Sequence, residues 1–116
     1  MRMAVKAYIE GDYAVALDAK AGKIAIRRIA RYGNPVADMP TVVFKVGDQA
    51  ISGSYNLTYL DPIEKITEKN VIFGKDKAYG PNAPRKFMKI SEFLWRNADF
   101  DLEKIKKDNA ETSQYI

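Results

Sequence analysis

The stretch that decides the fold is YAVALDAKAGKIAIRR, residues 13–28. On each side of a short loop, apolar side chains alternate with small or polar ones, which is the pattern of strands with one buried face. Asp18 can hydrogen-bond the backbone of the loop, and Gly22 supplies the positive φ that ends it. The stretch therefore predicts a β-hairpin whose loop spans residues 18–22.

A helix over residues 12–32 is the competing interpretation. This segment is rich in alanine, Asp12 could serve as its N-cap, and Gly33 with Pro35 could end it. In that helix, however, Gly22 would lie in the middle and would cost about 1 kcal/mol relative to alanine. We therefore favour the hairpin and keep the helix open as the alternative.

Strands on either side of this hairpin extend the predicted sheet. Residues 5–9 alternate in the same way and end at a Gly-Asp turn. Residues 33–40 form a linker, because two prolines and a Gly-Asn pair do not fit inside a sheet. Downstream of the linker, further strands are expected over residues 41–46, 55–59, 63–67, 71–73 and 85–90.

Two of these strands carry finer expectations. The strand over residues 55–59 places its tyrosines on one face, so the rings of Tyr55 and Tyr59 are expected in the core. Asn70 ends the loop before residues 71–73, and a left-handed conformation is expected there because Asn tolerates it.

The C-terminal part of the chain predicts one or two short helices. Ser91 is a favourable N-cap for a helix that runs through Asn97. Asp99 or Asp101 can cap a second helix over residues 102–109. We expect residues 110–116 to be a frayed tail, which leaves a single domain over residues 1–109.

Strands at intervals of roughly 8–12 residues, followed by helices, define the fold class. They predict a mainly β (α+β) domain, a small SH3-like or OB-like curved sheet or barrel of about six or seven antiparallel strands. Residues 16–24 are also similar to the hairpins of propeller repeats. A propeller needs several copies of that unit, so this likeness implies hairpin geometry alone.

The composition excludes most catalytic classes. The 116 residues include no Cys and no His, so the chain has no Cys or His nucleophile, no Ser-His-Asp triad, no zinc finger and no disulfide. It also lacks a signal-peptide core and a membrane-length apolar run. We expect a cytoplasmic protein that is not an enzyme, needs no cofactor and has no membrane partner.

Carboxylates are the remaining candidates for a metal site. Asp99, Asp101 and Glu103 could hold Mg²⁺ in a nuclease. We favour a structural role for them, because acids near a helix N-terminus meet unpaired N–H groups and the positive end of the helix dipole.

The net charge of +4 is unevenly distributed along the chain. Residues 1–33 hold seven basic and three acidic side chains and residues 75–98 hold six and two, so each segment carries +4. Cations interleaved with aromatic rings are typical of grooves that bind single-stranded nucleic acid. Lysines that keep a solvated strand edge from aggregating are the alternative. The candidate nucleic-acid-binding residues are Arg27, Arg28, Arg31, Lys75, Lys77, Tyr79, Arg85 and Lys86.

A protein-interaction module is the alternative function. Trp95 and Arg96 are its candidate protein-binding residues, because Trp and Arg are enriched at binding hot spots. The competing role for Trp95 is packing on the sheet. A small domain without catalytic groups fits an adaptor or inhibitor, such as a phage or mobile-element accessory protein that binds a larger host complex. An unpaired edge strand could also make a homodimer.

Overall fold

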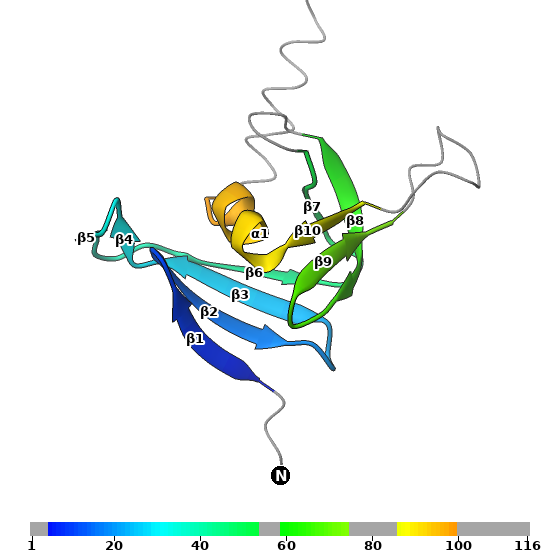
Figure 1. Cartoon of the computed structure of the whole chain (residues 1–116), viewed down its shortest axis with the longest axis horizontal. Coiled ribbons are helices and arrows are strands. Elements are labelled where there is room, and N and C mark those ends of the chain that lie inside the picture. Colours follow the sequence, from blue (N-terminus) through cyan, green and yellow to red (C-terminus); the bar gives the residue numbers. More distant parts are fainter. Residues whose placement is uncertain (1–4, 54–58, 75–85, 100–116) are drawn as a thin grey trace, which may run out of the picture.

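Antiparallel strands account for most of the residues that this computed structural model describes, which are 5–53, 59–74 and 86–99. The first sheet has the strand order β1 (Lys6–Glu10), β2 (Tyr13–Asp18), β3 (Lys23–Arg28) and β6 (Thr41–Lys45). The second has the order β10 (Phe87–Lys89), β9 (Asn70–Phe73), β8 (Leu60–Ile66) and β7 (Gln49–Ile51). A small finger of β4 (Ala30–Arg31) and β5 (Asn34–Pro35) and the helix α1 (Ile90–Asn97) complete the described chain (Figure 1).

The predicted hairpin is confirmed. Strands β2 and β3 pair in register from Tyr13 opposite Arg28 to Asp18 opposite Lys23. Asp18 Oδ1 accepts a hydrogen bond from the N–H of Ala21 at 2.9 Å, and the loop ends at Gly22 with φ +68°. The alternative helix over residues 12–32 is therefore wrong.

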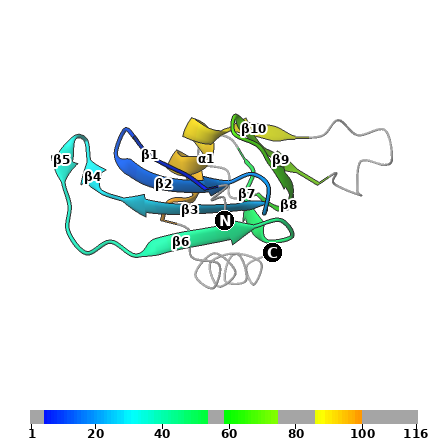
Figure 2. The same cartoon turned by 90° about the horizontal axis from the view of Figure 1, so that it is seen from below.

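The two sheets meet at the corner between β6 and β7. The N–H of Gly47 donates to the carbonyl of Ile63 at 2.8 Å, and the N–H of Ile63 donates to the carbonyl of Asp48 at 2.9 Å. Asp48 Oδ2 also accepts from the N–H of Lys45, which fixes the turn at Gly47 and Asp48. On the side away from this corner, β1 and β10 are the free edges, so the sheets form a curled half-barrel (Figures 1 and 2).

The core lies between the sheets and below α1. Phe93 of the helix is fully buried, with its ring centroid 5.3 Å from that of Phe44 and 6.3 Å from that of Phe73. Phe44 belongs to the first sheet and Phe73 to the second, so Phe93 joins both. The other large buried apolar side chains are Val15, Leu17, Ile24, Ile26, Ile51, Ile63, Ile66, Val71, Met88, Ile90 and Leu94. The small, mainly β, barrel-like fold with a C-terminal helix is thus as expected.

Two details of the helix and its neighbouring turn differ from the sequence prediction. Helix α1 begins at Ile90 directly after β10, with Lys89 at the N-cap position and no side-chain cap, so Ser91 is not the N-cap. Asn70 is not left-handed and begins β9. The turn before it is closed by the hydroxyl of Thr67, which accepts the N–H of Asn70 at 2.9 Å.

Other expectations differ in the loops. Tyr59 is 61% exposed, so its ring does not lie in the core. Pro35 pairs with Ala30 in the finger, a short pairing inside the segment expected to be a linker. The described residues form ten strands, in two four-stranded sheets and a finger, which is more than the six or seven expected. Residues 55–58, the second helix over 102–109 and the tail 110–116 lie outside the described residues. Within the described ranges, no helix has the length and hydropathy needed to cross a membrane.

Candidate functional site

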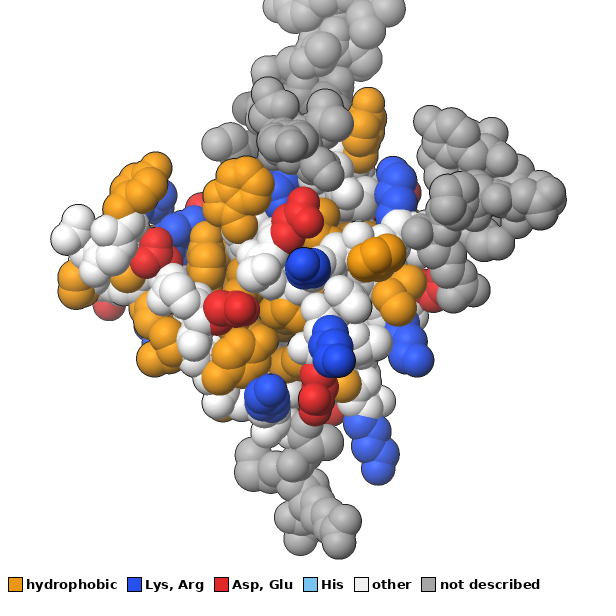
Figure 3. Space-filling model, in the orientation of Figure 1, with side chains coloured by type: hydrophobic (Ala, Val, Ile, Leu, Met, Phe, Trp, Pro, Cys, Tyr) orange, Lys and Arg blue, Asp and Glu red, His pale blue; other side chains and the backbone are white. Residues whose placement is uncertain are grey.

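The described residues of the predicted nucleic-acid set do not gather in one place. Arg27 is exposed on the outer face of β3, whereas its neighbour Arg28 points inward, because side chains alternate along a strand. Arg31 is exposed in the finger, and Lys86 lies just before β10 at the other end of the molecule (Figure 1). On the face drawn in Figure 3, Lys and Arg side chains are scattered among apolar and acidic ones. Lys75, Lys77, Tyr79 and Arg85 lie outside the described residues.

Arg28 belongs to an internal network rather than to an open basic surface. Its Nη2 donates to Asp99 Oδ2 at 3.0 Å and to the hydroxyl of Tyr13 at 3.3 Å. Its guanidinium carbon also lies 5.0 Å from the centroid of the Tyr13 ring. The hydrogen bond with Asp99 raises the pKa of Arg28 above its ordinary value. The pair ties β3 to the end of α1, and the Arg28 side chain is only 10% exposed.

Asp99 therefore has a structural partner as well. Asp101 and Glu103, the other members of the candidate Mg²⁺ cluster, lie outside the described residues. In the ranges that are described, no three carboxylates gather in a way that could hold a metal ion.

Lys86 is also engaged within the chain. Its Nζ lies 3.3 Å from Asp61 Oδ2 and 5.7 Å from the centroid of the Tyr59 ring. The ammonium group is nonetheless half-exposed, with 46% of the side chain accessible to solvent. Because the lysine side of the pair is open to water, the pair contributes little to stability, on the order of 0–1 kcal/mol, although the Asp61 side chain is only 13% exposed.

Trp95 is 59% exposed, so it does not pack into the core. The guanidinium carbon of Arg96 lies 5.5 Å from the centroid of the indole ring. Arg96 Nε donates to the carbonyl of Gly53 at 3.0 Å, which fixes the arginine against the end of β7. The helix thus presents a large aromatic side chain to solvent next to an immobilised arginine.

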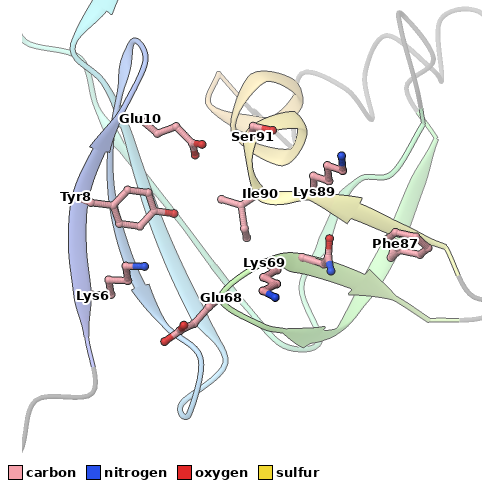
Figure 4. A pocket seen from close by; sticks show the side chains of 10 residues that line it. Lys6, Tyr8, Glu10, Glu68, Lys69, Phe87, Lys89, Ile90 and Ser91 are labelled. Carbon is pink, nitrogen blue, oxygen red and sulfur yellow. The ribbon is translucent and has the colours of Figure 1, made fainter.

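An open cleft of about 600 Å³ lies between the free edges of the two sheets (Figure 4). Its volume falls within the range of ligand-binding pockets, roughly 300–1,000 Å³. One wall is β1, whose inward side chains line it, and the turn before β9 closes one end. The opposite wall is β10 and the start of α1. The side chains that line these two walls include Lys6, Tyr8, Glu10, Phe87, Lys89 and Ile90.

The cleft combines an aromatic and apolar interior with charged margins. Tyr8 is half-buried, and its pKa is raised by burial and by the carboxylate of Glu10, so the phenol remains a neutral hydrogen-bond donor. Phe87 is 68% exposed in the cleft, and Ile90 is buried at its base. The ammonium group of Lys6 lies 5.5 Å from the centroid of the Tyr8 ring.

Both walls of the cleft are sheet edges. β1 ends the strand order of the first sheet, and β10 ends that of the second. An edge strand carries a row of backbone N–H and C=O groups without strand partners. The pairing of β1 with β2 runs without a bulge from Lys6 to Glu10, and this segment has no proline. The edge is therefore regular enough to accept another strand.

No family model matches the chain, and no curated protein or solved structure shows significant similarity to it.

The cleft residues were not singled out from the sequence. The alternation in residues 5–9 does place Tyr8 on the face opposite Ile9. The sequence holds no signal, however, that brings β1 near β10, since residues 10 and 87 are distant in the chain. Only the fold creates this site.

Proposed function

We propose that this protein is a non-enzymatic protein-interaction module that holds an extended segment of a partner protein between β1 and β10. The observation that carries the proposal is that a cleft of ligand-binding size has two unpaired sheet edges as its walls. A strand added along the free edge of β1 would extend the first sheet at this cleft. Strand addition of this kind gives affinity through main-chain hydrogen bonds and specificity through alternate side chains.

The lining defines the chemistry of the preferred segment. Tyr8 and Ile90 offer an aromatic and apolar surface inside the cleft, and Phe87 adds a second apolar contact further along β10 (Figure 4). Lys6 and Lys89 lie at the margins and favour acidic side chains at the flanking positions, while Glu10 favours a basic one. The best segment is therefore an apolar residue between charged ones.

The helix extends this surface beyond the cleft. Ser91 lines the cleft, and Trp95 follows it by four residues, which places both on the same face of α1 one turn apart. A segment that leaves the cleft along the helix would reach the exposed indole. The proposal thus keeps Trp95 and Arg96 as protein-binding residues, in a module suited to an adaptor or an inhibitor in the cytoplasm.

Nucleic-acid binding is less well supported by the geometry. Arg27, Arg31 and Lys86 lie on separate elements, and none of them lines the cleft. A single-stranded nucleic acid needs cations that follow its backbone and rings that stack on successive bases.

The test is a selection of random linear peptides, displayed on phage, against the immobilised full chain. Selected peptides are then synthesised, and their binding is followed by fluorescence anisotropy. We expect a shared apolar residue with flanking charges. Because Phe87 is an exposed wall of the cleft, Phe87→Asn is expected to weaken binding about tenfold or more, which corresponds to about 1.4 kcal/mol.

Tyr32→Asn is the matched control, since Tyr32 is an exposed aromatic residue at the tip of the finger and outside the cleft. It should leave the affinity unchanged. Failure to enrich any peptide, or equal binding by the Phe87 variant, would contradict the proposal. A labelled oligonucleotide that binds the chain while peptides do not, with affinity falling steeply as salt rises, would restore the nucleic-acid hypothesis.

A further inference from the structure

The outer face of the first sheet has an apolar centre with charged side chains around it, and no other described element covers it. Cross-strand partners point to the same side of a sheet. The register therefore gathers small side chains on this face, and exposed Ile9 and Val43 stand at its two sides, on β1 and β6. The alanines of this face are Ala7, Ala14, Ala16 and Ala25.

The alanines leave a shallow dent beside a projecting side chain. Its volume is about 270 Å³, and the four alanines line it together with Arg27 and Thr41. Ile9 is 70% exposed and lies directly across from Ala14. One face thus carries both an apolar projection and an apolar hollow that can receive it.

A projection and a hollow on one face are self-complementary under two-fold symmetry. A two-fold axis in the plane of contact, halfway between the two features, brings the projection of each copy over the hollow of the other. We infer that two copies of this chain pack outer face to outer face, with Ile9 of each copy in the alanine dent of the other. The partner is a second copy because a single chain supplies both halves of the contact.

The size of the face sets the strength of this dimer. Four strands of about five residues cover roughly 19 Å by 17 Å, or roughly 300 Å² on each copy. Stable interfaces bury about 800 Å² on each partner. We therefore expect a weak dimer that forms only at high protein concentration.

The charges around the dent make the dimer dependent on salt. The same face carries the cations Lys23, Lys45 and Arg27. Among the residues that pair β3 with β2 and β6, only Asp18 adds a carboxylate to this face. Two such faces repel each other, and salt screens that repulsion. Dimerisation should therefore strengthen as salt rises, whereas binding of an acidic partner protein to this face would weaken.

The experiment is sedimentation equilibrium of the full chain at low and high salt, over concentrations up to the millimolar range. We expect a monomer–dimer equilibrium that salt shifts toward the dimer. Ile9→Lys should abolish it, because a lysine would approach Arg27 of the other copy. Ile9→Glu should weaken the dimer less than Ile9→Lys does, because the carboxylate of the glutamate can pair with that arginine. Ala16→Val fills the dent and should weaken the dimer about tenfold.

Phe87→Asn is the control for this experiment, since Phe87 is equally exposed but belongs to the second sheet. A chain that stays monomeric at millimolar concentration and high salt would overturn the inference. A dimer unaffected by both Ile9→Lys and Ala16→Val would overturn it too. Because Tyr8 and Ile9 point to opposite sides of β1, loss of this dimer would leave peptide binding in the cleft intact, and the two proposals can fail separately.

Discussion

Asn97 is expected to be the most sensitive polar residue of the described chain. Its side chain is fully buried at the end of α1. Oδ1 accepts the N–H of Ile51 at 2.7 Å, and Nδ2 donates to the carbonyls of Ile51 at 3.1 Å and Phe93 at 3.3 Å. β8 pairs with one edge of β7, and the Asn97 amide pairs with the N–H and C=O of Ile51 on the other edge.

The cost of removing this amide follows from the groups it leaves behind. Asn97→Leu keeps the branched outline of the side chain but leaves the N–H and C=O of Ile51 without these partners at a position that is 7% exposed. Each of these two unpaired buried groups costs about 1–3 kcal/mol, so we expect a loss of about 2–6 kcal/mol. A domain of this kind has about 5–15 kcal/mol in total, so a large fraction of its stability is at stake.

Urea unfolding followed by circular dichroism measures this loss as a lower midpoint with an unchanged slope. Ser91→Ala on the exposed side of the same helix is the control and should change stability by less than about 0.5 kcal/mol. A loss below about 1 kcal/mol for Asn97→Leu would refute the reasoning. Water or a rearranged helix would then be replacing the amide.

Three further predictions concern ionisable and strained groups. Asp99→Ala should cost about 1.5–3 kcal/mol, because it leaves the nearly buried Arg28 without its anion, and this loss should exceed that of any exposed pair in the same urea assay. Tyr32 has φ +52° at the tip of the finger, so Tyr32→Asn should stabilise by about 1 kcal/mol, and a lower urea midpoint would contradict this. The raised pKa of Tyr8 means that the folded state keeps that proton longer than the unfolded state. Stability should therefore fall as pH rises above about 10, and Tyr8→Phe should reduce that fall in unfolding experiments across alkaline pH.

The strands could be predicted from the sequence because their signals are local. The alternation around Gly22, with Asp18 before it, specifies both the pairing and the loop, and both are confirmed. Ser91 misled the prediction of the helix start because its type favours an N-cap, whereas β10 runs straight into the helix at Ile90. The start of α1 is thus set by the strand before it, and the capping preference of a single residue does not predict that.

The candidate site was less accessible to prediction because it depends on contacts between distant segments. Arg28 looks like Arg27 in the sequence, yet adjacent strand positions face opposite sides, and only Arg28 meets Asp99. Tyr8 and Phe87 line one cleft because the two sheets curve toward each other, and neither residue's sequence context predicts this. The alanines of the outer face were visible as small alternating residues, but their exposure required knowing that nothing among the described elements covers them.

Hydrogen exchange of the β1 amides, with and without a selected peptide, tests strand addition in the cleft most directly. Glu10 and Tyr13 close a two-residue hairpin loop and form a hydrogen-bonded pair, so the N–H groups of Ala7 and Ile9 point to the free edge of β1. If the peptide adds as a strand, these two amides should exchange about tenfold or more slowly, while the free edge of β6 is unchanged. Binding that leaves Ala7 and Ile9 exchanging at their original rates would contradict the account.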